Sequence, residues 1–108
     1  MKGIGVDMVD LRRLDISNQT FIKHILSDEE YAYFLKLSSD KRKLEFVGGR
    51  FAGKEAYLKA YHLGLGGKKF KDISILNNFD GSPYLNDPHA LISISHEHNY
   101  AIAFVLIK

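Results

Sequence analysis

The 108-residue sequence predicts a single α+β domain, residues 1–108, in which an antiparallel sheet packs against a long helix. Three observations support this fold class. Apolar and polar residues alternate near the N-terminus, as they do in a strand. Helical spacing follows in the middle of the chain, and alternation returns over its last third, with turn residues between the segments. No period of about 20 to 50 residues recurs, which excludes a repeat architecture.

The first strand is expected over Gly3–Val9, where Ile4, Val6 and Met8 share one face. Asp7 lies on the other face, beside glycines that leave room for another group to approach closely. These glycines do not form a dinucleotide-binding fingerprint, because the third glycine is missing and no helix follows.

Helices are expected in the middle of the chain. Phe21–Leu26 has helical spacing, and Ser27-Asp28-Glu29-Glu30 is a capping box that opens the next helix. A new start signal at Ser39-Asp40 opens a long helix that is predicted to run to about His62. The glycines expected to close this helix are Gly64, Gly66 and Gly67.

Three further strands are expected over Asp72–Leu76, Leu91–His96 and Tyr100–Ile107, with turn residues from Asn77 to Pro83. The last strand is apolar on both faces. One face can cover the long helix, whereas the other needs a partner.

Composition excludes several classes of protein. The chain has no cysteine, which removes disulfides, zinc–thiolate sites, iron–sulfur clusters and cysteine nucleophiles. Its longest uninterrupted apolar run, Tyr100–Ile107, has eight residues, far short of the roughly 20 that span a bilayer. The N-terminal residues lack the apolar core of a signal peptide. We therefore expect a cytoplasmic protein with no membrane segment.

Basic residues gather in the long helix, although the formal net charge of the chain is only +2. Six basic and two acidic residues between Lys41 and Lys59 give this stretch a charge of +4, which leaves −2 for the rest. Either a solvated helix face or a phosphate-bearing ligand explains the pattern. A nucleic-acid surface would need a more basic domain, so no nucleic-acid partner is expected.

Glu55 is the most informative residue of this helix. On a helical projection it falls about 20° from Leu44, inside an apolar stripe. A carboxylate there is costly unless it is paired, protonated or metal-bound. A salt bridge to a neighbouring base and a metal or catalytic role both remain open.

Asp7 is the second candidate carboxylate, because aspartate is disfavoured inside strands. Two carboxylates without cysteine suit a hard cation such as Mg²⁺, which also takes water and substrate phosphate oxygens. Arg50, Lys54 and Lys59, close to Glu55 in the helix, would neutralise further phosphate charge.

Four motifs stand in order along the chain: Gly3-Ile4-Gly5-Val6-Asp7-Met8-Val9-Asp10 followed by Arg13, Gly49-Arg50-Phe51-Ala52-Gly53-Lys54-Glu55-Ala56 followed by Lys59, Gly81-Ser82-Pro83-Tyr84, and Ser93-Ile94-Ser95-His96. Together they resemble the motifs of the holo-acyl-carrier-protein synthase family. The resemblance covers essentially the whole chain. It implies the 4'-phosphopantetheinyl transferase fold, and an enzyme that transfers 4'-phosphopantetheine from coenzyme A to a serine of apo acyl carrier protein, releasing adenosine 3',5'-bisphosphate.

The resemblance also implies roles for individual residues. Asp7 and Glu55 would ligate Mg²⁺ on the coenzyme A diphosphate, and Lys59 would join them as a catalytic residue. The contacts with coenzyme A or its phosphates would come from Lys41, Arg42, Arg50, Lys54, Lys59, Gly81, Ser82, Pro83 and His96. The small members of the family are homotrimers whose active sites lie between subunits. We expect the same here, with the sheet near the three-fold axis.

In the implied reaction, the serine oxygen attacks the β-phosphorus in line, and cations offset charge on the leaving phosphate. A metal-bound water, Glu55 and Lys59 all remain possible general bases. The basic residues expected to meet the acidic carrier are Arg12, Arg13, Lys23 and His24, with Phe21, Ile22 and Ile25 as apolar contacts. The preceding segment, 14–20, is shorter than is usual in the family.

Two other functions use the same features. A Mg²⁺-dependent phosphodiesterase or nuclease would predict a wider basic surface and further acids for a second metal. A non-catalytic nucleotide-binding module would tolerate the loss of Glu55, whereas a transferase would not.

Overall fold

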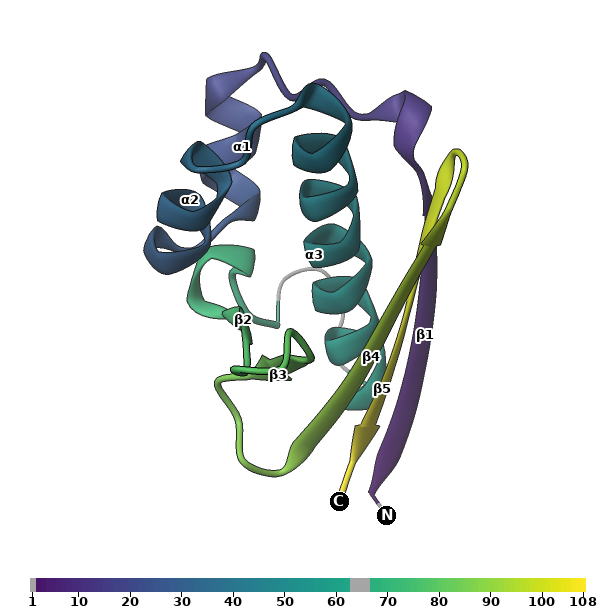
Figure 1. Ribbon diagram of the computed structural model, residues 1–108. Coiled ribbons are helices and arrows are strands. Elements are labelled where there is room, and N and C mark those ends of the chain that lie inside the picture. Colours follow the sequence, from purple (N-terminus) through teal and green to yellow (C-terminus); the bar gives the residue numbers. More distant parts are fainter. Residues whose placement is uncertain (1, 63–66) are drawn as a thin grey trace.

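The computed structural model describes residues 2–62 and 67–108 of the chain (Figure 1). The elements follow one another as β1 (Gly3–Asp10), the 3₁₀ helix η1 (Leu11–Arg13), α1 (Gln19–Ile25), α2 (Asp28–Leu35), α3 (Asp40–Ala60), the 3₁₀ helix η2 (Phe70–Asp72), β2 (Ile75–Asn77), β3 (Pro83–Leu85), β4 (Ala90–Glu97) and β5 (Tyr100–Ile107). The α+β class is confirmed, with the long helix where the sequence predicts it.

The main sheet has three antiparallel strands in the order β1-β5-β4. Helix α3 lies against one of its faces, and α1 and α2 pack on the opposite side of α3 (Figure 1). The N-terminal and C-terminal strands are neighbours, so the two ends of the chain meet at one end of the sheet. A short hairpin, β2-β3, forms a second sheet beside α3.

Two glycines let β1 approach α3 closely. A Cβ on Gly3 would lie 2.0 Å from the carbonyl oxygen of Ala60, and a Cβ on Gly5 would lie 2.0 Å from that of Ala56. Any side chain at either position would therefore push the strand off the helix. Asp7 is the next residue on this face of the strand, so the same approach brings its carboxylate to α3.

The predicted helix starts are present. The Ser27 hydroxyl accepts a hydrogen bond from the Glu30 amide, and the Glu30 carboxylate accepts one from the Ser27 amide, which completes the capping box. Ser39 caps α3 through the Arg42 amide. Helix α3 ends at Ala60, two residues before the expected His62. Of the glycines expected to close it, Gly64 and Gly66 lie outside the described residues.

The strand expected over Asp72–Leu76 is shorter than predicted. Residues 70–72 form η2, and β2 begins only at Ile75. Ile73 and Ile75 are nevertheless both buried against α3. Their alternation therefore identified core residues correctly, although only the second one pairs in a strand.

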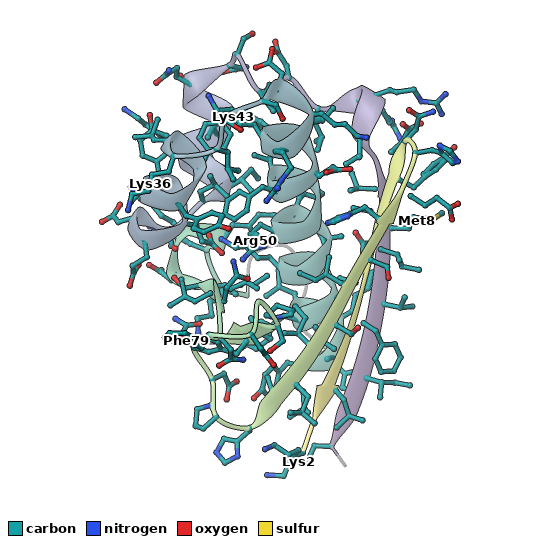
Figure 2. The ribbon with its side chains drawn as sticks, viewed as in Figure 1. Lys2, Met8, Lys36, Lys43, Arg50 and Phe79 are labelled. Carbon is teal, nitrogen blue, oxygen red and sulfur yellow. The ribbon has the colours of Figure 1, made fainter. Side chains whose placement is uncertain are left out.

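The two faces of the main sheet differ as predicted. On β5, Ala101, Ala103 and Val105 are buried under α3, whereas Ile102 and Phe104 point to the other side and are more than 40% exposed. The exposed face also carries Ile4, Val6, Met8 and Leu91 from the two neighbouring strands. Met8 points away from α3 in Figure 2. We call these six residues the outer sheet face.

In the described part of the chain, no helix combines the length and the hydropathy that crossing a membrane requires.

Candidate active site

Asp7, Glu55 and Lys59 come together where β1 runs along α3. The Lys59 ammonium donates hydrogen bonds to the Asp7 carboxylate at 3.0 Å and to the Val6 carbonyl oxygen at 3.2 Å. Glu55 stands one helical turn before Lys59 on the same side of α3. The structure thus joins the three residues that the sequence singles out for catalysis.

The electrostatics of this group favour a cation. Partial burial raises the pKa of Glu55, the negative charge of Asp7 raises it further, and Lys59 opposes both effects. Within the residues that the structure describes, Lys59 forms its ion pair with Asp7, so the Glu55 carboxylate has no ammonium partner of its own. Among the described residues, no three side chains of His, Cys, Asp and Glu gather in one place. Two carboxylate ligands, completed by water and phosphate oxygens, match the requirements of a hard divalent ion.

A second group lines a cavity of about 310 Å³ on another side of α3. Four of its residues are those expected to contact coenzyme A: Arg42, Arg50, Gly81 and His96. The remaining lining residues are Tyr33, Leu37, Glu45, Phe46 and Asn77. We call this cavity the basic cavity. It brings together α3, the turn between β2 and β3, and the end of β4.

Arg50 is held rigidly in this cavity. Its guanidinium donates to the Ile75 carbonyl oxygen at 3.0 Å and to the Asn77 side-chain oxygen at 3.1 Å, and it stacks 4.2 Å from the centre of the Phe46 ring. Figure 2 shows the side chain between α3 and the hairpin. An arginine fixed by these contacts presents its remaining donors to the cavity without a further loss of side-chain entropy.

The turn at the edge of the basic cavity is also held by its own side chains. Gly81 has φ +90°, and a Cβ there would meet no atom within 4 Å, so the turn needs glycine for its backbone conformation. The Ser82 hydroxyl bonds to Asp80 at 2.6 Å and to Asn78 at 3.1 Å. Pro83 begins β3 directly after this turn.

The sequence predicts that Lys54 contacts a phosphate of coenzyme A, and the structure shows that this prediction is wrong. The Lys54 side chain has no exposed surface. The ammonium donates to Glu30 at 2.5 Å, to the Ile25 carbonyl at 2.6 Å and to the Phe70 carbonyl at 2.9 Å. All three protons are used inside the protein, so none is left for a ligand. Lys41, also expected to contact coenzyme A, is exposed at the start of α3. It lines neither the basic cavity nor the larger cavity that contains Glu55.

A third feature is a larger cavity of about 960 Å³, with Glu55 in its wall. Its apolar part includes three aromatic rings, Phe21 from α1, Phe51 from α3 and Phe70 from η2. The other lining residues are Thr20, Lys23, His24, Ile25, Lys68, Lys69 and Lys71. We call it the aromatic cavity. Lys68, Lys69 and Lys71 are not among the site residues predicted from the sequence, although the run Lys68-Lys69-Phe70-Lys71 is a visible signal.

The structure also corrects the predicted carrier contacts on α1. Ile22 and Ile25 are each only 2% exposed and belong to the core between α1, α2 and α3. Their helical spacing reflected this core, so they present no surface to a partner. Phe21 is partly exposed and lines the aromatic cavity, and Arg13 is exposed on η1.

Comparison with known proteins identifies the family. Residues 3–105 match the 4'-phosphopantetheinyl transferase superfamily. The chain belongs to this superfamily. Curated relatives in it include the holo-[acyl-carrier-protein] synthases of Geobacillus sp. and Anoxybacillus flavithermus, which are 46% and 47% identical to this chain. Both alignments cover 98% of this chain, and they cover 95% and 94% of those proteins.

Solved structures agree with this 4'-phosphopantetheinyl transferase assignment. A holo-(acyl-carrier-protein) synthase from Bacillus anthracis in complex with CoA (3',5'-ADP) has a TM-score of 0.89 and 37% sequence identity, over 98% of this chain and 95% of that one. The Helicobacter pylori synthase in complex with coenzyme A has a TM-score of 0.81 and 28% identity, over 97% and 99% of the two chains. The predicted family is confirmed.

Proposed function

We propose that this chain transfers 4'-phosphopantetheine from coenzyme A to a serine of apo acyl carrier protein and releases adenosine 3',5'-bisphosphate. The observation that carries the proposal is the likeness to holo-acyl-carrier-protein synthases along nearly the whole chain. The junction of Asp7, Glu55 and Lys59 supports it, because the transfer needs charge neutralisation beside the diphosphate. The proposed setting is fatty acid synthesis in the cytoplasm.

Asp7 and Glu55 are proposed to hold Mg²⁺. Two observations support this: the negative charge of Asp7 raises the pKa of Glu55, and Lys59 pairs with Asp7 alone among the described residues. When bound, the ion would neutralise the coenzyme A diphosphate and orient it for in-line displacement. The fold supports this proposal: the glycines of β1 bring Asp7 to α3, and Glu55 lies on that helix close enough for the charge of Asp7 to raise its pKa. Lys59, hydrogen-bonded to Asp7, supplies a further positive charge next to the phosphates.

In the transfer, the bond from the serine oxygen to the β-phosphorus forms as the bond from that phosphorus to the leaving 3',5'-bisphosphate breaks. The serine proton must then go to a base. Glu55 and Lys59 are the two candidate side chains, and in this proposal the Glu55 carboxylate would be bound to Mg²⁺ during the transfer. Lys59 already donates hydrogen bonds to two oxygens, as a protonated amine does.

Two copies of the chain are proposed to build each active site. Arg50 and Glu55 are five residues apart in α3, so they project about 140° apart around the helix. The basic cavity and the carboxylates thus lie on different sides of one chain, whereas coenzyme A must meet both. The apolar outer sheet face supports self-association. We propose a homotrimer in which one copy supplies Asp7, Glu55 and Lys59 and its neighbour supplies Arg42, Arg50, the 81–83 turn and His96.

The direct test of activity is to incubate the protein with coenzyme A, Mg²⁺ and apo acyl carrier protein and to weigh the carrier by mass spectrometry. A transferase adds one phosphopantetheinyl group to the carrier and releases adenosine 3',5'-bisphosphate. A phosphodiesterase would cleave coenzyme A with no change in carrier mass. A nucleotide-binding module would change neither substrate.

The shared site is tested by mixing two variants after dissociation and reassembly. Glu55→Gln removes a carboxylate from one side of the site, and His96→Ala removes a basic-cavity residue from the other. Each variant alone should lose most transfer, whereas mixed assemblies contain sites with both residues intact and should regain it. No recovery on mixing would mean that each site lies within one chain.

A further inference from the structure

The aromatic cavity is a preformed apolar surface that opens beside Glu55. The Phe21 and Phe51 rings lie 6.5 Å apart, and the Phe51 and Phe70 rings meet edge to face at 5.6 Å. These rings come from three different elements. The buried Lys54 ammonium ties two of them together, since it bonds to the carbonyl oxygens of Ile25 at the end of α1 and of Phe70 in η2. The walls of the cavity are therefore fixed before any partner arrives.

The rim of this cavity is strongly basic. Lysine side chains come from both sides. Lys23 and His24 belong to α1, and Lys68, Lys69 and Lys71 belong to residues 68–72, which end in η2 and which we call the η2 segment. Glu55 is the only acidic residue among the described lining residues. All four lysines are exposed. A surface of this sign attracts an anionic partner.

These lysines have no counter-charge of their own. In residues 2–62 and 67–108, the ion pairs made by lysine are Lys54 with Glu30 and Lys59 with Asp7. Residues 63–66 contain no acidic side chain that would add another. The nearby contacts of the rim are with rings instead, Lys23 over Tyr31 and Lys68 over Tyr57. Like charges placed this close repel one another unless a partner supplies the opposite charge.

Two anionic substrates take part in the proposed reaction, coenzyme A and the carrier protein, and their chemistry indicates which one binds at the aromatic cavity. The phosphates of coenzyme A have the basic cavity as their candidate site, with Arg42, Arg50 and His96. The acceptor serine must reach the carboxylates, and the aromatic cavity is the one with Glu55 in its wall. It is therefore open to the second substrate on the side of α3 where the serine has to arrive.

We propose that the η2 segment, through Lys68, Lys69 and Lys71, is the main electrostatic docking element for the carrier protein. This inference rests on the proposed transferase function. The partner is an acidic domain with carboxylates beside its acceptor serine and an apolar side chain close by. The carboxylates pair with the lysine rim, and the apolar side chain packs on the rings of Phe21, Phe51 and Phe70. Helix α1 contributes only Lys23 and His24 to the rim, whereas the η2 segment contributes three lysines. The apolar residues Ile22 and Ile25 of α1 face the core.

The test compares Lys69→Ala/Lys71→Ala with a matched control, Lys2→Ala/Lys108→Ala. The control removes the same charge from exposed lysines that do not line the cavity; Lys2 lies at the end of the sheet where the chain ends meet (Figure 2). Steady-state kinetics are measured with coenzyme A and with apo acyl carrier protein as the varied substrate, at low and high NaCl. Binding is measured separately with a carrier whose acceptor serine is replaced by alanine.

For Lys69→Ala/Lys71→Ala we expect the KM for the carrier to rise about tenfold at low salt and its salt dependence to flatten. The KM for coenzyme A and the kcat should stay within about twofold of the parent. The control should match the parent in every measurement. A rise in the KM for coenzyme A instead would assign these lysines to donor phosphates, and parent-like carrier kinetics would mean that they dock nothing; either result overturns the proposal. Absence of transfer by the parent protein would overturn the proposed function itself.

Discussion

Replacing Lys54 with methionine tests whether the ion pair of Lys54 with Glu30, the most deeply buried one in the described structure, stabilises the fold. Lys54 and Glu30 have no exposed side-chain surface, and their charged atoms are 2.5 Å apart. Glu30 also accepts hydrogen bonds from the amides of Ser27 and Ile75, at 2.8 and 2.7 Å. The pair therefore links α3 to the end of α1, the start of α2, η2 and β2.

The expected loss in the free energy of unfolding depends on which groups lose a partner in Lys54→Met. Methionine fills nearly the same volume, so the cavity contribution is small. The Glu30 carboxylate keeps two amide donors but loses its counter-charge, and the Ile25 carbonyl loses the ammonium proton. The Phe70 carbonyl still accepts from the Ile73 amide. Breaking one partner of a buried pair costs about 3–5 kcal/mol, a large part of the roughly 5–15 kcal/mol that stabilises a domain.

Urea unfolding followed by circular dichroism measures this loss, and a double-variant cycle assigns it to the pair. Glu30→Gln alone should also destabilise, because it buries an ammonium without a counter-charge. In Lys54→Met/Glu30→Gln both charges are absent, so the loss should be about 2 kcal/mol smaller than the sum of the single losses. Additivity within about 0.5 kcal/mol would refute the coupling. Under conditions where Lys54→Met is folded, its KM for coenzyme A should stay within about twofold of the parent, and a large rise would restore the phosphate role that the structure denies.

Three further predictions follow from the site and the sheet. Without divalent cations, Glu55→Gln should be at least as stable as the parent at pH 7. The folded-state pKa of Glu55 lies above its ordinary value of 4.5, so the free energy of unfolding of the parent falls as the pH rises from the ordinary pKa to the folded-state pKa. The variant lacks this carboxyl group and does not show the loss. Mg²⁺ should raise the melting temperature of the parent only, and transfer by the variant should fall at least about a hundredfold. Gly5→Ala should cost about 1–3 kcal/mol in urea unfolding and lower transfer per folded molecule, because its Cβ displaces β1 and with it Asp7; a parent-like variant would show that this approach is unimportant. Phe104→Lys, in the middle of the outer sheet face, should turn a trimer into monomers by light scattering, and a parent of monomer mass would disprove the assembly.

Most of the fold is predictable because it depends on local patterns. The alternation over residues 3–9 and 100–107 specifies which side chains face α3, and the capping box at Ser27 specifies where α2 begins. The glycines of β1 predict a close approach, and α3 provides it. What the alternation does not specify is pairing. The first and last strands are neighbours in the sheet, and only tertiary packing determines that order.

The carboxylate site is predictable for a related reason. Asp7 and Glu55 each break a local rule, one as an acid in a strand and the other as an acid in an apolar stripe, and both exceptions meet at one place. The two isoleucines assigned to the carrier break no rule. Apolar residues at helical spacing are core residues by default, and Ile22 and Ile25 are in the core. The lysines at 68, 69 and 71 become informative only once the fold places them around a cavity beside Glu55.

Lys54 and Glu55 show why adjacent residues of one motif diverge in role. Successive residues of a helix project about 100° apart, so the two side chains leave α3 toward different surroundings. Lys54 points toward α1, η2 and the Glu30 carboxylate, where water is excluded and every proton has a partner. Glu55 points toward Asp7 and Lys59, where its negative charge is only partly compensated. Whether a basic residue next to a candidate metal-binding carboxylate contacts a ligand or the core therefore depends on what surrounds the helix on the side to which that residue points.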